Sequence, residues 1–419
     1  MSGQWDSVIT IGKIAEKSGI DYYYLNYRMG IAYYNRKNFF MASHYLEKAL
    51  QQNAGAHSDE LFNRTLYLSY IYTLRNRKAL SVPLSFAQRP NPLALSKLYI
   101  YGGGGSSVPF DLSDIQRPGG PGHNPGQTPS SELAYLHYQQ GQGAGGFSID
   151  HIFGPKLSMD FSFSAFRFDD VASFENDDSL TINTFPIYQQ SFALIPEYGF
   201  NNKWSLRLAI GFTHNSGEPY VLYDTSLYYL RTYGKYKVNI NNILAGGVLY
   251  YHLAKSKIGL EIGFSNYSKR TQYQAGLNYL IFPFGNMNFY SLSSLSAKYE
   301  NSETKVVFYQ KFGFKTFSRL WVELSGRFGE LKNFNVFSEG YGYNTTDHIN
   351  TIIKAKFIFL ASAQLDLFVE GNFYKRHGLR YEVYQNNDER ISKVNYEYWT
   401  VLGGLVWSFN NGTHKNKIK

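Results

Sequence analysis

The sequence has no cysteine among its 419 residues, which argues against thiol catalysis and against a thiolate metal site. It also lacks any run of about 18 apolar residues, so a membrane-spanning helix is excluded. The net charge of +9 is spread along the chain, without a basic helix or an interleaved aromatic and basic motif, so nucleic acid is not an expected partner. The motifs HExxH and GxSxG are absent, and we expect no enzyme activity, no cofactor and no metal.

Two further sets of polar residues give little sign of a site. The ten histidines are scattered, and most fall where we expect strand ends or loops. The acidic residues Asp169, Asp170, Glu175, Asp177 and Asp178 are denser. Clustered carboxylates can bind calcium or bridge lipopolysaccharide through divalent cations. We interpret them instead as part of a solvated extracellular loop.

What the chain does have is aromatic residues, 37 tyrosines and 32 phenylalanines, together with a strict alternation of side chains. In Lys203–His214 the large apolar residues Trp204, Leu206, Leu208, Ile210 and Phe212 alternate with small or charged ones. Successive side chains of a strand face opposite sides, so such a strand separates two different solvents. A transmembrane barrel needs this pattern, with lipid outside and polar contacts inside, and its aromatic girdles use many rings.

The same alternation returns along the last two-thirds of the chain. Its charged residues fall on the face opposite the apolar one, and we expect these to line the lumen: Asp160, Arg207, Glu261, Glu323, Arg327, Asp366 and Glu370. In a narrow lumen such charges have to pair. In a wide one they tune selectivity.

Short turns and long loops separate the predicted strands. The short turns are Gly154–Lys156, Asn201–Lys203, Lys255–Lys257, Phe284–Asn286, Lys315–Ser318 and Ala361–Ala363, and the long loops are Asp169–Pro186, Asn215–Val238, Gly329–His348 and Lys375–Lys393. Assigning the short turns to the periplasm and the long loops to the outside predicts a barrel of about 14 strands in residues 131–410. The strands are expected to begin near Ser131, Gly145, Leu157, Tyr188, Lys203, Ile240, Lys257, Gln272, Met287, Lys305, Arg319, Thr351, Gln364 and Asn395. If Tyr220–Tyr233 holds a further hairpin, the alternative is a barrel of 16 strands. An even count places both termini in the periplasm.

Residues 1–90 carry apolar residues at helical spacing instead. We expect four helices, Trp5–Lys17, Tyr22–Tyr34, Phe39–Gln52 and Glu60–Arg75. The middle pair resembles a tetratricopeptide repeat, because Met29, Gly30 and Tyr33 match its first helix and Ala42, Leu46 and Ala49 match its second. Asn26 and Ala54 depart from the usual aromatic and proline of that motif. The alternative is a generic helical hairpin domain.

The fold class is therefore α+β and multidomain. Between the helices and the barrel, residues 91–130 hold Gly102–Gly105 and the Gly/Pro-rich Arg117–Pro129, which indicates a flexible tether, or alternatively a plug in the barrel mouth. Residues 411–419 form a polar tail. No signal peptide is visible at Met1, so we interpret the chain as a mature one that was exported to the outer membrane.

Periplasmic repeats joined to a barrel of about 14 strands resemble the surface lipoprotein assembly modulators, and the Tyr/Phe/Asn/Lys-rich style also resembles envelope-complex barrels of the Bacteroidetes type. The resemblance implies that residues 1–90 recruit a protein client or partner for export, assembly or anchoring at the cell surface. A repeat groove is chiefly a protein-binding surface, and we expect partner contacts at Tyr22, Tyr23, Asn26, Tyr33 and Tyr34. Lipid and lipopolysaccharide are the other expected partners. The alternatives are a porin-like solute channel and a structural subunit of a larger secretion or uptake complex.

Overall fold

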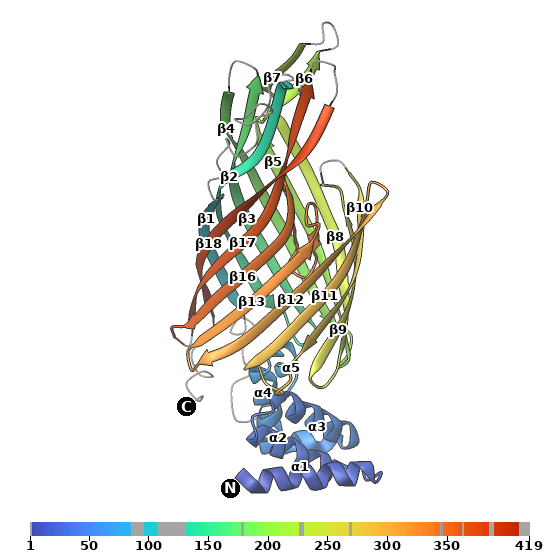
Figure 1. The fold of residues 1–419 in the computed structure, drawn as a ribbon. Coiled ribbons are helices and arrows are strands. Elements are labelled where there is room, and N and C mark those ends of the chain that lie inside the picture. Colours follow the sequence, from blue (N-terminus) through green and yellow to red (C-terminus); the bar gives the residue numbers. More distant parts are fainter. Residues whose placement is uncertain are drawn as a thin grey trace.

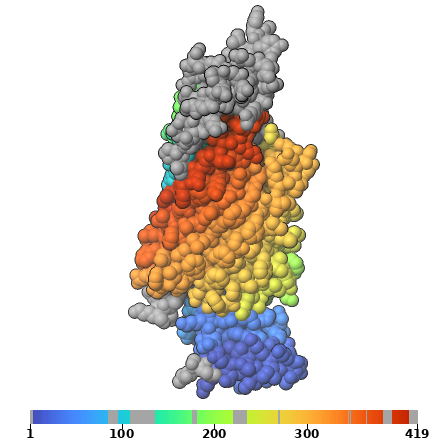
Figure 2. Space-filling model, in the orientation of Figure 1, coloured from blue at the N-terminus to red at the C-terminus, as the bar shows by residue number. Residues whose placement is uncertain are grey.

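The computed structural model describes residues 2–84, 96–107, 131–176, 180–225, 230–267, 270–343, 345, 347–362, 364–384 and 389–409. The chain forms a helical domain at one end of a tall β-barrel (Figures 1 and 2). The helices are α1 (Ser2–Lys17), α2 (Tyr23–Asn35), α3 (Phe39–Gln52), a 3-10 turn (Ala54–Ser58), α4 (Glu60–Tyr72) and α5 (Asn76–Ala79). None of the described helices is long and apolar enough to cross a membrane.

The barrel is closed and has 14 antiparallel strands, as the alternation predicts. They are β1 (Lys97–Ser107), β2 (Ser131–Ile152), β3 (Leu157–Asn176), β4 (Leu180–Gly199), β5 (Trp204–Gly217), β8 (Val238–His252), β9 (Ser256–Ser265), β10 (Gln272–Ile281), β11 (Phe289–Glu300), β12 (Glu303–Phe317), β13 (Leu320–Gly329), β16 (His348–Leu360), β17 (Leu365–Tyr384) and β18 (Glu389–Ser408). Each strand pairs with its neighbour in this order, and β1 pairs with β18 to close the ring.

The alternation in β5 separates the outer wall from the lumen. Leu208, Ile210 and Phe212 expose 42%, 54% and 41% of their surface, whereas Ala209 between them is fully buried. Large apolar side chains are exposed in the same way on the other strands. In water this surface would be very costly, so the outer wall is one that hydrocarbon covers.

The first strand was not predicted. Lys97–Ser107 lies in the segment interpreted as a tether or plug, yet it forms β1 and pairs with β18 and β2. Its run of glycines hides the alternation, because a glycine carries no side chain to face either solvent. The glycines are needed here: a Cβ on Gly103 would lie 2.1 Å from the carbonyl oxygen of Val401. The prediction of a strand that begins at Gly145 is wrong, since Gly145 lies inside β2. The missed strand β1 and this extra strand cancel, so the predicted number of barrel strands is still 14.

Several predicted loops are also strand. Much of Asp169–Pro186 belongs to β3 and β4, and much of Lys375–Lys393 belongs to β17 and β18. Polar residues on both faces indicated loops, but strands that rise beyond the apolar band meet water on both faces. The hairpin in Tyr220–Tyr233 exists as β6 (Tyr220–Thr225) and β7 (Leu230–Lys235), which form a separate two-stranded sheet and add nothing to the barrel. Asp177, Asp178, Arg117–Pro129 and residues 411–419 lie outside the described residues.

The barrel is pinched at the end away from the helices. β16 begins at His348 and pairs with β17 only as far as His377. Beyond that point, residues Arg380–Tyr384 of β17 pair with β2 in place of β16. Asp347 ties this region together by accepting hydrogen bonds from the Gln139 backbone N–H at 3.0 Å and from the Tyr396 hydroxyl. The pairing brings β17 against β2 and narrows this mouth of the barrel.

The helices form a small bundle of successive antiparallel neighbours. Gly30 lets α2 and α3 approach, because a Cβ there would lie 2.6 Å from the Leu46 side chain. Tyr33 is buried and stacks on Tyr45 at 5.3 Å, and Asn26 is fully buried and donates to Gln52 at 2.8 Å. The expectation that Asn26 and Tyr33 contact a partner is therefore wrong, because packing of the bundle already covers both side chains.

The helical domain rests on the barrel rim. Phe40 stacks on Phe282 at 4.2 Å between ring centroids, and its backbone N–H donates to the carbonyl oxygen of Gly285 at 2.9 Å. Lys78 donates to the Glu47 carboxylate at 2.9 Å and to the Asn202 carbonyl at 3.3 Å, and burial lowers the pKa of Lys78. The predicted short turns lie at this rim, and β18 also ends there (Figure 1).

Candidate functional site

Residues 330–343, here called the inward loop, leave the wall after β13 and fold into the lumen. Within the loop, β14 (Asn335–Val336) pairs with β15 (Tyr341–Gly342). At its tip, a Cβ on Gly340 would lie 2.7 Å from the side chain of Ile195 on β4. Since β4 is the seventh strand from β13 in both directions around the ring, the loop reaches the opposite wall. It therefore crosses the lumen.

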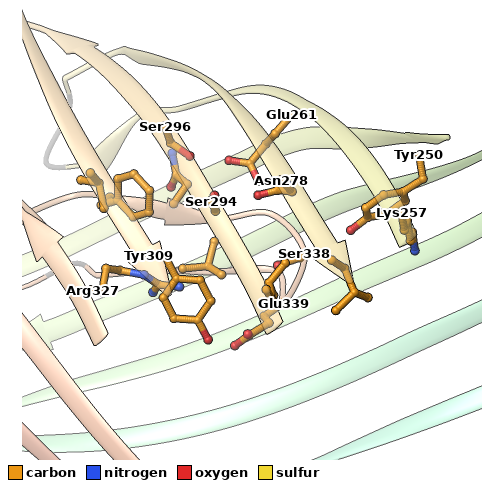
Figure 3. Close-up of a pocket in the computed structure, with 16 residues that line it drawn as sticks. Tyr250, Lys257, Glu261, Asn278, Ser294, Ser296, Tyr309, Arg327, Ser338 and Glu339 are labelled. Atoms are coloured by element: carbon orange, nitrogen blue, oxygen red, sulfur yellow. The ribbon is translucent and has the colours of Figure 1, made fainter. Parts of the chain in front are cut away.

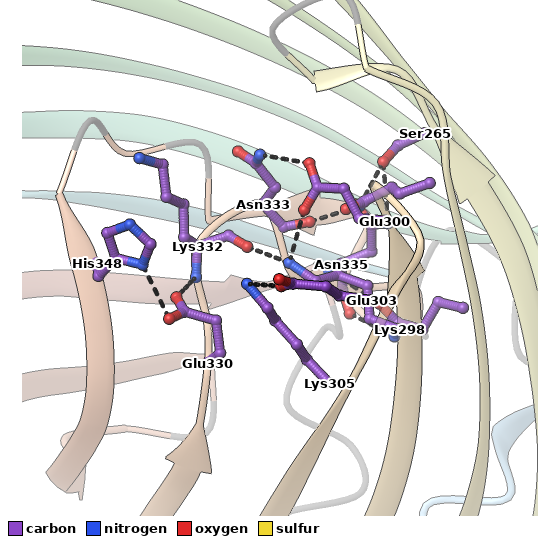
Figure 4. Close-up of polar contacts among 12 residues, drawn as sticks. Ser265, Lys298, Glu300, Glu303, Lys305, Glu330, Lys332, Asn333, Asn335 and His348 are labelled. Atoms are coloured by element: carbon purple, nitrogen blue, oxygen red, sulfur yellow. Dashed lines mark hydrogen bonds and ion pairs between the residues drawn. The ribbon is translucent and has the colours of Figure 1, made fainter.

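Polar contacts hold the inward loop to the wall near its start (Figure 4). Lys298 on β11 donates to the Lys332 carbonyl, and Asn333 donates to the Glu300 carboxylate at 3.0 Å. Asn335 exchanges two hydrogen bonds with the Gln274 side chain on β10, at 2.9 and 3.1 Å. These contacts satisfy buried backbone groups of the loop, which would otherwise be costly in the lumen.

An apolar contact holds the tip. Phe337 is fully buried and packs with Ala193, Ile195, Ala209, Leu244 and Val248, which project inward from β4, β5 and β8. Two wall glycines make room for its ring. A Cβ on Gly263 would lie 2.2 Å from Phe337, and a Cβ on Gly246 would lie 2.5 Å from it. The wall is thus shaped to receive this phenylalanine.

Two cavities lie beside the loop in the lumen, of about 120 and 210 Å³. Figure 3 shows the residues that line the smaller one. Tyr309, Arg327 and Glu339 line both, so they form the partition between them. Arg327 donates to the Tyr343 hydroxyl at 2.7 Å and lies over the Tyr309 ring at 4.5 Å. Glu339 is exposed to the cavities and forms no ion pair with the other described residues.

The wall around Glu339 carries charges of both signs. Lys311 pairs with Glu323 at 3.3 Å, and Lys354 pairs with Glu370 at 3.4 Å. These pairs offset the cost of holding charges in a narrow space. Lys356 also lines the larger cavity and lies over the ring of Phe368 at 4.1 Å. A solute passing the partition would meet basic and acidic groups together.

A second charged cluster lies toward the helical end. Arg207 on β5 pairs with Asp160 and, at 3.4 Å, with Glu197. Its Nε also donates to the carbonyl oxygen of Ser338 in the inward loop at 3.0 Å. Arg207 therefore joins two strands of the wall to the loop tip.

The structure places the residues predicted to line the lumen as follows. Glu261 lines the smaller cavity, Glu323 and Glu370 line the larger one, and Arg327 lines both. Asp160 and Arg207 meet in the second cluster, and Asp366 lies between the outward-facing Leu365 and Leu367 of β17. Of the residues expected to contact a partner, Tyr22 is exposed, and Tyr23 and Tyr34 are half-buried.

The inward loop with its Glu339 was not predicted, and neither were four charged residues of the wall, namely Glu197, Lys311, Lys354 and Lys356. The signal that was available is composition. Leu331, Phe334, Val336 and Phe337 are strongly apolar for a loop assigned to water. Of the acidic cluster, Asp170 is buried and pairs with His137 at 3.2 Å, whereas Asp169 pairs with the exposed Arg167 at 2.9 Å. Among the described residues, no group of three or more metal-ligating side chains occurs.

No family model and no curated protein matches this chain. Among solved structures, a Pseudomonas aeruginosa FadL homologue is 10% identical with a TM-score of 0.43, covering 76% of this chain and 93% of that one. The Pseudomonas putida toluene transporter TodX is 6% identical with a TM-score of 0.44, covering 76% and 92%. Pseudomonas aeruginosa OccK11 is 11% identical with a TM-score of 0.28, covering 74% and 96%. These neighbours are outer-membrane β-barrels, and the likeness is one of fold.

Proposed function

We propose that the protein is an outer-membrane channel for small polar solutes, which the inward loop holds closed in this conformation. The observation that carries the proposal is the partition of Tyr309, Arg327 and Glu339 between two cavities inside a closed barrel. A barrel of this size without an inward loop has room for a lumen that water fills. The loop is held by buried apolar side chains near its start (Leu331, Phe334 and Val336) and at its tip (Phe337) and by hydrogen bonds, and no covalent bond ties it to the wall. Such a loop is a suitable gate.

The solutes that suit this lumen are small and charged, or zwitterionic. Glu339 stands among Lys311, Lys354 and Arg327, so the partition presents an acidic group and several basic groups to the same space. Charged side chains in a constriction select solutes by charge. An apolar solute would gain little there, because it would have to displace water from charged groups that it cannot hydrogen-bond.

The barrel is proposed to span the outer membrane, with lipid and lipopolysaccharide around the apolar wall and with the helical domain in the periplasm. Short turns lie at the helical end of the barrel, and bacterial barrels place short turns in the periplasm. The inward loop then connects β13 and β16 from the extracellular side.

Planar-bilayer recording tests the channel. We expect low conductance with brief openings from the wild type, and a large steady current when residues 333–342 are replaced by a short Gly–Ser link. The matched control replaces residues 218–237, which include the separate β6–β7 sheet, by the same short Gly–Ser link and should leave the current unchanged. A folded variant that lacks residues 333–342 and carries no current would refute the proposal.

The charge of the partition gives a second readout. Glu339→Gln should lower the preference for cations, measured as the reversal potential in a salt gradient. The expected change is about fivefold, the factor for roughly 1 kcal/mol of Coulomb energy between close charges in water. The control is Glu303→Gln, because Glu303 is well exposed at the β11–β12 turn and, among the residues that the structure describes, pairs with Lys305 alone, at 3.3 Å. Equal selectivity in the two variants would place the selecting charges elsewhere.

A second proposal is that residues 1–90 bind a protein partner for export, assembly or anchoring at the cell surface. The observation that favours it is the exposure of Ile11 and Ile14 on α1, at 66% and 60%, on the helix farthest from the barrel (Figure 1). Apolar side chains exposed in this way are typical of protein contacts. Native purification of the wild type and of Ile11→Asp/Ile14→Asp tests it, and a stoichiometric subunit that co-purifies with both alike would contradict it.

A further inference from the structure

The helical domain reaches into the charged cluster of the barrel through one arginine. Arg77 of α5 pairs with the carboxylate of Glu197 on β4. Its Nη1 donates to the carbonyl oxygens of Glu197 and Lys156, at 2.9 and 3.0 Å. The Arg77 and Glu197 side chains expose only 18% and 13% of their surface, so water competes weakly for this pair.

Glu197 is shared between the helical domain and the barrel wall. One carboxylate oxygen, Oε1, is held by Arg77, and the other, Oε2, meets Arg207 at 3.4 Å. The Nε of Arg207 donates to Ser338 in the inward loop at 3.0 Å. Three side chains therefore connect α5 without interruption to the tip of the loop.

We infer that docking of the helical domain on the barrel rim stabilises the closed position of the inward loop through Arg77, Glu197 and Arg207. This regulation rests on the proposed channel function. With Arg77 in place, Glu197 makes only a long contact with Arg207, and Arg207 stays on Ser338. Without Arg77, the partly buried carboxylate of Glu197 keeps only the 3.4 Å contact with Arg207, which compensates its charge poorly. Glu197 then draws Arg207 toward β4 and away from the loop. A partner that lifts the helical domain off the rim then opens the channel.

The connection from Arg77 through Glu197 to Arg207, here called the relay, can be tested without undocking the whole domain. Phe40 holds the domain to the rim independently, through its ring contact with Phe282 and its hydrogen bond to Gly285. Arg77→Met removes the charge and keeps much of the side-chain volume. Arg36→Met is the matched control, because Arg36 pairs with Asp6 at 2.9 Å on the exposed surface of the same domain.

The chain has no cysteine, so Ser338→Cys introduces a single thiol whose reaction with a soluble maleimide reports release of the loop tip. The hydrogen bond from Arg207 goes to the backbone of residue 338, so this substitution leaves it in place. In full-length protein in lipid vesicles, Arg77→Met should speed the labelling about 3- to 30-fold, the range of typical coupling between sites. Arg36→Met should not change it. Adding Arg207→Met to Arg77→Met should give no further increase, because both remove one relay.

Labelling at the same rate in Arg77→Met and Arg36→Met would overturn the inference, and so would simple additivity of Arg77→Met and Arg207→Met. Bilayer current, measured in parallel, separates this inference from the channel proposal. Faster labelling without current keeps the coupling and refutes the channel. Current from the variant that lacks residues 333–342, with no effect of Arg77→Met on labelling, keeps the channel and refutes the coupling. Heat-dependent gel mobility confirms that each barrel is folded before it is scored.

Discussion

Truncation of Phe337 is the sharpest test of how the inward loop stays closed. The ring is fully buried against five aliphatic side chains of the wall, and it fills the space that Gly246 and Gly263 leave. When the loop leaves the wall, this contact is lost. Phe337→Ala removes most of it in advance, and truncation of a buried phenylalanine costs about 3–5 kcal/mol. Since about 1.4 kcal/mol is a factor of ten, the balance between closed and open loop should shift by roughly a hundredfold to a few thousandfold.

The assay is single-channel recording in planar bilayers, with open probability as the readout. The open probability of Phe337→Ala should rise by about two to three orders of magnitude, up to saturation. The control is Phe328→Ala, because Phe328 lies on β13, next to the loop, and exposes 43% of its surface on the outer wall. Gly263→Ala approaches the same contact from the wall, since its Cβ would lie 2.2 Å from the ring and 2.8 Å from the Ala245 carbonyl oxygen. In the protein that folds, it should open the channel in the same direction. A folded Phe337→Ala protein with the open probability of Phe328→Ala would refute the argument that this contact closes the lumen.

Two predictions concern the other parts of the fold. Gly103→Ala should impair barrel assembly, because its Cβ would lie 2.1 Å from the carbonyl oxygen of Val401. In the control Gly102→Ala the nearest atom to the new Cβ lies at 3.5 Å, so this substitution should be tolerated. The folded fraction of each variant on a heat-modifiability gel is the measurement, and equal folding would contradict the close approach. Asp59→Ala should lower the free energy of unfolding of the helical domain by about 1–2 kcal/mol, since Asp59 caps α4 and accepts a hydrogen bond from Tyr27 at 2.8 Å. Its thermal transition by circular dichroism, with the barrel transition unchanged, is the measurement.

The sequence predicts most of the barrel because alternation is a local property of each strand. Lys203–His214 needs only lipid on one side and polar contacts on the other to become β5, and most other strands carry the same signal. β1 was not predicted, because Gly102–Gly105 have no side chains that could alternate between the two faces. The requirement for glycine comes from β18, which is distant in the sequence, so no local pattern reveals it.

The site was less predictable than the barrel, for a related reason. That Arg207 and Glu323 face inward follows from their strands. The contact of Arg207 with Ser338 depends on which loop folds inward, and the contact of Glu197 with Arg77 depends on where the helical domain docks. No local sequence pattern around Glu339 predicts that this segment crosses the lumen to β4. Only the apolar residues of that loop, such as Phe337, indicate that it does not lie in water.

Phe337 and the two glycines opposite it show that wall and loop fit each other. A glycine inside a strand weakens it, since it adds backbone entropy and packs nothing. At Gly246 and Gly263 a larger residue would collide with the ring of Phe337 and also with a carbonyl oxygen of the paired strand, that of Ile262 or Ala245. In the proposed open state the same positions would face water. The wall is therefore complementary to the loop as it lies in this structure, which favours the closed state of the proposed channel. Opening then requires an input of free energy, and the Arg77–Glu197–Arg207 connection is a route by which the helical domain can supply it.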